Sequence, residues 1–540
     1  MRRPHADEAL LLPVLAFLVL FALVPVAVLF ARAFAMSGGA AGVASALTSA
    51  ANVRSIDNSL VQGALSAILA VTIGYPAGVF LGRYEWPGRS AVRSFLLVPF
   101  LLPSLVVVLG VVDLFGTSGL VSSALPATAV LGRGLPGIVV ANLLFNVPIV
   151  MLLTATGTEG SSLELEETVA TLGGSPARAY LEVWAWPSWV GAIAGGLLTF
   201  LFSALSFAPP LLLCGPGCYT VEAQIWFLDT FGLEPGAAGI LSAASVALFA
   251  VPTVVYLIVL GRLRTGARAL PRPPRILRRG EPVALGLAAE TAAVLVAILG
   301  LLAAVLYRAV APIGGGASGS AWSTLFSAST TARLGISIEG AVGNTLLFAT
   351  MAAGIASVLG IVTGFAVAQH PRRSKVVGFA LFVPLMLSPI VLAFALAEFW
   401  RPLLGGESTV WALVIVSQAA LALPLALQSL QIPLSSLAPE AREAARTLGA
   451  GAWEAFVDAD LPRVREGLVT AGLFAFALGL GEFTATYFLV TPTFTTLPVA
   501  LYALANTRFY PLADAAAGLL LLLSLAVFAT IVVGGRRVEL

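Results

Sequence analysis

Acidic side chains inside apolar segments are the first candidates for chemistry in this sequence. Glu482 lies in a Gly-Leu-Gly-Glu-Phe-Thr run, deep in a long apolar segment, with Thr484 beside it. An ionisable group inside a membrane segment is costly, so it is a functional hypothesis by default. A carboxylate there could attract a cation on a transport path. The alternative is a buried Glu that is protonated or hydrogen-bonded to a neighbouring helix.

Three further acids fall in or near apolar segments. Asp113 and Glu398 lie near segment ends, where we expect solvated helix-end acids; the alternative is a gate or a contact with an external binding protein. Glu290 lies early in its segment, where a long side chain can snorkel. We assign no role to Glu290.

The two cysteines, Cys214 and Cys218, enclose a Gly-Pro-Gly sequence. These residues suit a tight loop closed by a disulfide, which persists on the outer side of a membrane. A metal site is disfavoured because His5 and His370 lie far away in the sequence. The sequence also lacks a Ser-His-Asp grouping, paired catalytic carboxylates and a cysteine-rich metal motif, so we expect neither intrinsic enzyme activity nor a bound cofactor.

The composition indicates a membrane protein. Of 540 residues, 59% are hydrophobic and 10% are charged, against about 25% charged in soluble proteins. The net charge is +2, and no basic cluster is interleaved with aromatic residues. Nucleic acid is therefore not an expected partner, and the lipid bilayer is.

Twelve segments are apolar enough to cross a bilayer, which needs about 20 residues. We therefore predict an all-α integral membrane protein. The first segment is too long for the apolar region of a signal peptide, so we expect it to span. The predicted spans are 10–34, 58–82, 95–115, 136–156, 190–213, 240–262, 283–307, 342–369, 376–400, 410–430, 466–490 and 512–534.

The basic residues predict the orientation of these spans. With the N-terminus inside, 22 of the 29 Lys and Arg residues fall in inner segments and six in outer segments. We therefore expect a multi-pass protein of the cell membrane with both termini in the cytoplasm. The Cys214–Cys218 loop is then outside.

The sequence contains an internal repeat. Asn58-Ser59-Leu60 matches Asn344-Thr345-Leu346 at an offset of 286. Pro148 matches Pro424, and Ser206 matches Glu482, at an offset of 276. An even number of spans separates equivalent points, so we predict two parallel repeats of six spans with a pathway at their interface. The expected boundaries are 1–262 and 283–540 for the repeats and 263–282 for an Arg- and Pro-rich cytoplasmic linker.

A polar, helix-forming segment occurs once in each repeat, at 164–187 (the first island) and 439–462 (the second island). Each reads as helix, turn, helix. In the second island we expect a helix from Pro439, a break at Gly449 and a short helix near 452–460 that ends at Leu461-Pro462. The alternative for one copy is a simple loop helix. Two copies favour a surface that meets a two-fold partner.

The second island resembles the signature of the permease subunits of type I ABC importers. It keeps Glu443-Ala444-Ala445, Gly449 and Leu461-Pro462, with Ala459 in place of the usual Ile. The first island keeps Glu167, Gly173 and Pro187, but it has Thr168-Val169 for Ala-Ala and one extra residue before the Pro. Two permease halves in one chain resemble the ferric iron and thiamine branch.

The resemblance implies a type I permease fold whose islands couple to two separate ATPase subunits. It also implies alternating access and an external solute-binding protein that delivers thiamine, ferric iron or another small solute. Lys375 is the only Lys and is not in a Gly-Lys-Ser/Thr context, so ATP and Mg²⁺ would bind the partner. The alternative is an ion-coupled secondary transporter; a membrane scaffold is disfavoured by the repeat and Glu482. The unequal signatures predict asymmetric docking.

Overall fold

The computed structural model is helical throughout its membrane segments. It describes residues 11–161, 163–266, 275–276, 282–311, 321–327, 331–332, 335, 337–369, 384, 387–435, 439–491, 494–507 and 509–536. Ten helices in this part of the chain are long and apolar enough to span a membrane, and two shorter apolar helices, Gly467–Gly481 and Leu497–Asn506, accompany them. The all-α prediction is therefore confirmed.

The chain divides into two compact units. The first unit joins residues 1–36 to residues 317–540, and the second unit is 37–316. These units differ from the predicted repeats because the first span of each repeat packs with the other repeat. The helix α3 (Val24–Met36) contacts α23 (Pro389–Leu404), and α17 (Pro282–Val310) contacts α5 (Ala50–Arg83) and α8 (Ser104–Phe115). The predicted repeat boundaries describe sequence similarity and stay a prediction.

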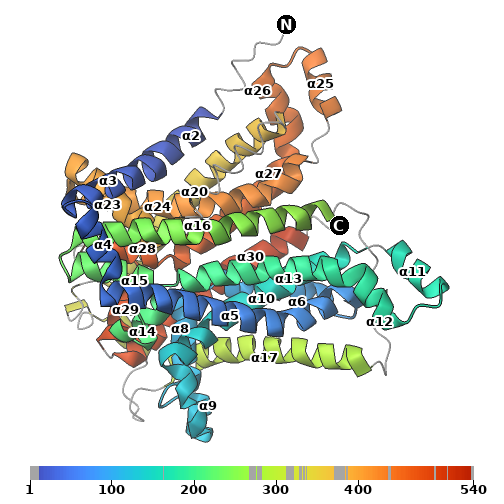
Figure 1. Ribbon diagram of the computed structural model, residues 1–540. Coiled ribbons are helices and arrows are strands. Elements are labelled where there is room, and N and C mark those ends of the chain that lie inside the picture. Colours follow the sequence, from blue (N-terminus) through green and yellow to red (C-terminus); the bar gives the residue numbers. More distant parts are fainter. Residues whose placement is uncertain are drawn as a thin grey trace. The chain divides into compact units, whose positions relative to one another are not determined.

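The elements of the second unit run from α4 to α17 (Figure 1). They are α4 (Ala40–Thr48), α5, β1 (Tyr84–Glu85), α6 (Arg89–Phe95), α7 (Val98–Leu101), α8, α9 (Leu120–Ala124), η2 (Pro126–Gly132), α10 (Gly134–Glu159), α11 (Leu163–Thr171), α12 (Pro176–Ala179), η3 (Tyr180–Trp184), α13 (Ala185–Ala204), α14 (Ala208–Leu213), η4 (Pro216–Cys218), α15 (Val221–Thr230), α16 (Pro235–Gly266), β2 (Arg275–Ile276) and α17.

The first unit repeats much of this order. Its elements are α2 (Leu12–Leu18), η1 (Val19–Leu23), α3, α18 (Ala321–Leu325), α20 (Ile338–Gln369), α23, α24 (Gly406–Ser435), α25 (Pro439–Thr447), α26 (Ala452–Ala455), η6 (Phe456–Asp460), α27 (Leu461–Gly481), α28 (Thr484–Leu489), α29 (Leu497–Asn506) and α30 (Tyr510–Arg536). The elements from α11 to α15 recur 276 residues later as α25 to α29, which supports the predicted repeat.

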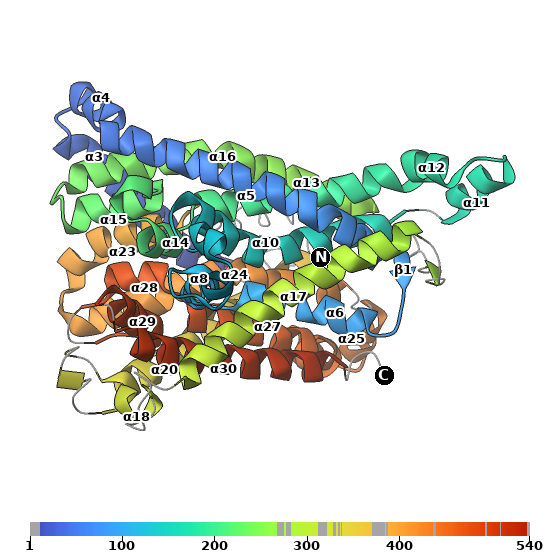
Figure 2. The same cartoon turned by 90° about the horizontal axis from the view of Figure 1, so that it is seen from below.

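Small residues set the packing of the second unit, where α5, α10 and α13 lie side by side (Figures 1 and 2). Gly74, Gly78 and Gly82 follow one another every four residues on α5. An added Cβ at these positions would come within 2.8, 2.6 and 2.7 Å of α10 atoms. Without a hydrophobic driving force in lipid, such close backbone approach drives helix association.

Three predicted spans are shorter than expected. The third is interrupted between α7 and α8 at Leu102-Pro103. The fifth and eleventh end at Ala204 and Gly481, and a separate short helix follows each break. Of the ninth span, residues 376–383 lie outside the described residues, and α23 has 16 residues. Hydropathy cannot detect these helix breaks, because the residues on both sides of each break are equally apolar and the average over the segment stays high.

The predicted linker is partly attached to the second unit. Helix α16 continues to Gly266, and Arg275–Ile276 pair in parallel with Tyr84–Glu85. The rest of this segment, 267–274 and 277–281, lies outside the described residues.

Candidate functional site

The two islands have the same backbone structure. Each consists of a nine-residue helix (α11 or α25), a glycine turn, a four-residue helix (α12 or α26) and a five-residue π-helix (η3 or η6) that leads into a long helix. In Figure 1, α11 and α12 project beyond one end of α13, and α25 and α26 project beyond one end of α27. The sequence difference between the islands therefore leaves the backbone unchanged.

Both turns depend on a glycine with a left-handed backbone, Gly173 at φ 76° and Gly449 at φ 95°. After each glycine, an amide reaches back five residues: Gly174 N–H donates to Val169 O (2.8 Å) and Ala450 N–H to Ala445 O (3.1 Å). This is the Schellman end of a helix, which favours glycine. The break predicted at Gly449 is confirmed.

The turns expose one large apolar side chain each. Leu172 is 82% exposed and Leu448 is 90% exposed. They occupy equivalent positions directly before the glycines, and the predicted residues Glu167, Glu443 and Ala444 are exposed on the helices that precede them. Each island therefore exposes a leucine directly before its glycine and a carboxylate five residues earlier.

One prediction about the islands is wrong. The segment near 452–460 does not end at Leu461-Pro462, because η6 continues without a break into α27, where Pro462 occupies the first turn. Proline has no N–H to donate to the preceding turn, and here that turn is the π-helical η6, where the hydrogen-bond pattern changes. The extra residue before Pro187 does not lengthen the first island, because α13 begins at Ala185, 276 residues before α27 begins at Leu461. Pro187 therefore stands one position further into its helix.

The first island is tied to the membrane helices by charge. Arg83, at the end of α5 and only 6% exposed, forms an ion pair with Glu166 of α11. Its guanidinium also lies 5.2 Å from the centre of the Trp184 ring in η3. The Glu159 carboxylate at the end of α10 pairs with Arg89 and Arg93 of α6. An ion pair thus links α11 to α5.

Within the first island, Arg178 pairs with Glu182 at 2.7 Å on the exposed side. The hydrogen bond and the charge of Glu182 raise the pKa of Arg178 above its usual value. Arg178 therefore stays fully charged.

Glu482 lies in the break between α27 and α28, where its carboxylate caps the short helix. It accepts from the N–H of Ala485 (2.7 Å), the N–H of Thr486 (2.8 Å) and the Thr486 hydroxyl (2.5 Å). A carboxylate is stabilised at a helix N-terminus by such donors. These bonds join Glu482 to the next helix, α28, as the hydrogen-bonded alternative expects. The Thr486 hydroxyl also accepts a hydrogen bond from Gln418 Nε2 of α24 (3.3 Å). Thr484 is the first residue of α28.

Ser206 occupies the equivalent break between α13 and α14, but it is held differently. Gln62 of α5 donates to Ser206 Oγ (3.1 Å) and to Ser203 O (2.8 Å). Asn142 and Asn146 of α10 extend this buried polar cluster: Asn142 donates to Ser66 Oγ at 3.1 Å, and Asn146 to the Asn142 carbonyl at 2.8 Å.

This cluster was missed as a unit in the sequence because Gln, Asn and Ser on separate helices carry no common spacing. The fully buried Glu222 of α15 was also missed; Ser245 Oγ lies 3.3 Å from its carboxylate.

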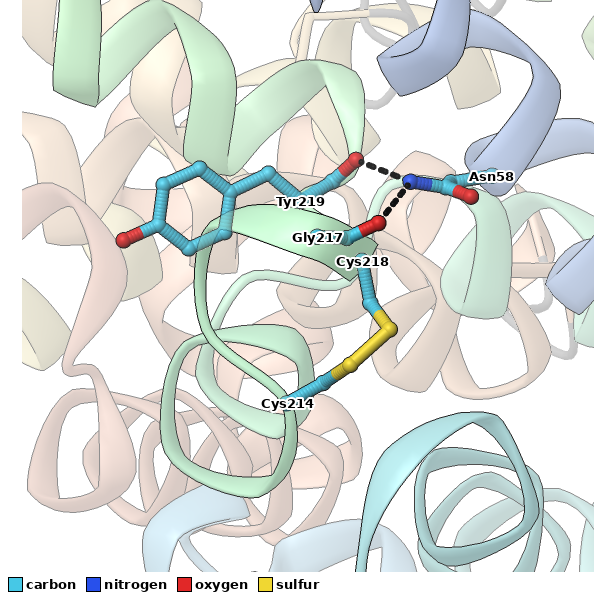
Figure 3. Close-up of a disulfide and its surroundings, with 5 residues drawn as sticks. All are labelled: Asn58, Cys214, Gly217, Cys218 and Tyr219. Atoms are coloured by element: carbon cyan, nitrogen blue, oxygen red, sulfur yellow. Dashed lines mark hydrogen bonds between the residues drawn. A yellow bond between two sulfur atoms is a disulfide. The ribbon is translucent and has the colours of Figure 1, made fainter.

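Cys214 and Cys218 are joined by a disulfide that closes the loop between α14 and α15 (Figure 3). The equivalent loop of the first unit is closed by a β-bridge between Thr491 and Phe494. Beside the disulfide, burial raises the pKa of Tyr219. Two different links thus close the same turn in the two repeats.

Matching hydrogen bonds fix both loops to the long helix that follows the first span. Asn58 Nδ2 donates to Gly217 O and to Tyr219 O (3.1 Å, Figure 3), and Asn344 Nδ2 donates to Thr495 O (2.9 Å). The Val221 N–H donates to Ser59 Oγ, and the Leu497 N–H donates to Thr345 Oγ1. The Asn-Ser/Thr match found in the sequence therefore has a structural cause.

The remaining acids are placed as follows. Asp113 is 7% exposed, so the expectation of a solvated helix-end acid is wrong for this residue. Glu398 is half-buried and lies 3.5 Å from Arg32. Glu290 is half-buried in α17. Within the described ranges, no three metal-ligating side chains gather into a possible ion site.

Comparison with known proteins identifies the family. Residues 356–538 match the model of the binding-protein-dependent transport system inner membrane component. A probable molybdenum ABC transporter permease protein of Haloferax volcanii is 30% identical over 240 residues, which cover 43% of this chain and 83% of that protein. The chain belongs to this permease family. Its all-helical architecture is the type I ABC importer permease fold.

Other relatives match the ABC permease over most of its length. The thiamine transport system permease protein ThiP of Brucella abortus is 25% identical over 489 residues, covering 88% of this chain and 86% of the relative. ThiP of Escherichia coli is 25% identical, with 82% of this chain and 81% of the relative covered. The permease is thus a multi-pass inner-membrane protein. The ThiP relatives match most of this chain, and the Haloferax volcanii relative matches less than half of it.

Proposed function

We propose that this permease imports a small solute of the thiamine type by alternating access, driven by ATP hydrolysis on two separate subunits. The observation that carries the proposal is the duplication of the islands, with one backbone structure at equivalent points of two repeats. A pair of like surfaces suits a pair of like partners. The islands and both termini would lie in the cytoplasm.

The island tips provide the docking chemistry. Leu172 and Leu448 are large apolar side chains that protrude from polar segments. Burying one leucine in a partner's groove contributes about 1.5–3 kcal/mol. Because both turns share one geometry, we propose that the two docking events are alike in backbone arrangement and differ in side-chain contacts.

The helical path behind each tip would transmit the partner's motion. From α12 to α13, and from α26 to α27, the chain stays helical through a π-helical turn. In the first island, the Arg83–Glu166 ion pair adds a lateral link to α5. A rigid-body movement of an island would therefore tilt the spans to which it is joined.

The relatives support the solute class. The relatives that match over most of this chain are named thiamine permeases, so we favour thiamine over ferric iron. An external binding protein would deliver the solute. We propose that the breaks containing Ser206, Glu482 and Thr484 border its path, because polar groups there interrupt otherwise apolar spans.

Replacing the two tip leucines tests the coupling role. We expect the double variant Leu172→Ser, Leu448→Ser to bind the ATPase subunits at least ten-fold more weakly, from the loss of at least about 1.4 kcal/mol. Binding is measured by titrating purified ATPase into the detergent-solubilised permease. Leu404→Ser, which changes another exposed leucine, is the control. Unchanged binding and ATP-driven uptake in the double variant would contradict the proposal.

The solute is tested by uptake into proteoliposomes that contain the permease, its ATPase and its binding protein. We expect uptake of labelled thiamine that requires ATP and is not competed by ferric complexes. Uptake driven by a proton or sodium gradient without ATP would favour the ion-coupled secondary transporter instead.

A further inference from the structure

A cavity of ≈ 180 Å³ lies in the second unit beside the first island. It is lined by Thr156, Gly157, Gly160, Trp186, Pro187, Val190, Arg262 and Leu263. These residues come from the end of α10, the beginning of α13 and the last turns of α16. The cavity far exceeds the roughly 10–15 Å³ that one water needs, so it can hold a larger group.

Two glycines line this cavity. Gly157 lies near the end of α10, and Gly160 directly follows that helix. Gly157 also allows α13 to approach closely, since an added Cβ would lie 2.2 Å from Pro187 O. In the other repeat, the equivalent positions carry Pro433 and Ser436 in the sequence. The cavity is thus a feature of the first repeat's own sequence.

Exposed apolar side chains on two helices lead to the cavity. On α16, Val251, Val255 and Ile258 are exposed, and Arg262 continues the same side of the helix at positions i, i+4, i+7 and i+11. These side chains form an apolar row that ends in a guanidinium. Such a row fits an acyl chain whose polar end reaches Arg262.

A second apolar row lies on α13, where Trp186, Trp189 and Ile193 are exposed. Helices α13 and α16 pack against each other, as Figures 1 and 2 also show. Tryptophan is enriched at the membrane–water interface, because its ring is apolar and its N–H is polar. Trp186 of this row and Arg262 at the end of the α16 row both line the cavity.

Arg262 gives the cavity a cationic side chain. It is one of the lining residues and is exposed. Guanidinium binds phosphate oxygens through parallel hydrogen bonds, and basic pockets between spans bind anionic headgroups.

We propose that this cavity binds one anionic phospholipid, with its phosphate at Arg262 and its acyl chains along the apolar rows of α13 and α16. Trp186 and Pro187 belong to the first island, so the bound lipid would contact the segment that joins the island to the membrane. The position equivalent to Arg262 is Val538, so the expected stoichiometry is one lipid per chain. The proposal is independent of which solute is transported.

Native mass spectrometry of the detergent-purified permease, titrated with phosphatidylglycerol, tests this site. We expect one tightly bound lipid, and binding weakened about five-fold or more in Arg262→Ala. Arg262→Lys should retain part of the affinity, because the charge remains. Arg133→Ala is the matched control, since it removes one positive charge at the opposite end of α10 and should bind like the wild type.

The melting temperature without added lipid verifies that each variant is folded. Trp186→Ala is a second variant, which removes an apolar wall and leaves the charge. It should weaken binding as well. Equal phosphatidylglycerol affinity in wild type, Arg262→Ala and Trp186→Ala would overturn the proposal. Equal affinity of the wild type for phosphatidylglycerol and phosphatidylethanolamine would overturn its preference for an anionic lipid.

Discussion

Single residues at equivalent positions show how the two repeats have diverged. Ser206 and Glu482 occupy the same break, yet Ser206 accepts a hydrogen bond from Gln62 on another helix and Glu482 caps its own short helix. Ser206 is therefore bonded directly to another long helix, whereas Glu482 is connected to α24 only through Thr486, which accepts a hydrogen bond from Gln418. Gly173 and Gly449, in contrast, have kept one conformation because the turn requires it.

The glycine turns give a prediction at the residue scale. Gly449→Ala places a Cβ in a left-handed conformation, which costs roughly 1–2 kcal/mol. The end of α25 should open more often, and the Ala450 amide that bonds to Ala445 O should exchange about 5–30-fold faster. Hydrogen exchange measured by mass spectrometry provides the readout.

Gly354→Ala is the control for this variant. Gly354 lies within α20, has no atom within 4 Å of a built Cβ and has no positive φ, so alanine there should leave exchange at Ala450 unchanged. Unaltered exchange in Gly449→Ala would mean that the turn does not depend on glycine.

Among the elements, much of the island could be predicted from the sequence, and its connection to the membrane could not. Gly449 marked the turn because glycine alone tolerates its backbone cheaply. Pro462 is compatible with the end of one helix and with the first turn of the next, and only the fold distinguishes the two. The breaks before Pro103 and at Glu482 were hidden inside continuous apolar runs. The repeat of Asn58-Ser59 can be recognised in the sequence. Its hydrogen-bond partners, Gly217, Tyr219 and Val221, carry no sequence pattern that marks them.

The loops that follow these breaks give a prediction at the element scale. Ser59→Ala and Thr345→Val each remove the acceptor of a buried amide at the beginning of α15 or α29. An unsatisfied buried group costs about 1–3 kcal/mol. Each variant should lower the melting temperature of the protein. Backbone amide hydrogen exchange should become faster only in the loop that has lost its acceptor.

Thr350→Val is the matched control for these variants, because the exposed Thr350 hydroxyl bonds to Leu346 O within its own helix. It should melt like the wild type. If Ser59→Ala loosens both loops equally, the loops are not held separately as their hydrogen bonds indicate. The disulfide is expected to limit the effect in the loop that contains Cys214 and Cys218.

For the whole molecule, the main departure from the sequence is the exchange of first spans between repeats. The sequence could not predict this exchange, because the lipid-facing and protein-facing sides of α3 and α17 are both apolar. Specific contacts show it: Arg32 donates to Glu398 O at 2.7 Å, and Gly110 of α8 leaves room for Leu301 of α17. Each compact unit therefore requires residues from both halves of the chain.

This exchange predicts how a divided chain would behave. When residues 1–266 and 282–540 are produced as two polypeptides in one cell, we expect them to co-purify in mild detergent, since α3 packs on α23 and α17 packs on α5 and α8. Removing residues 1–36 from the first polypeptide should weaken this association, because one exchanged helix is lost. Arg32→Ala in the full-length first polypeptide is the milder control, which removes one side-chain contact and leaves the packing of α3. Separate elution of the intact polypeptides would contradict the exchange, because neither compact unit can be completed by one half alone.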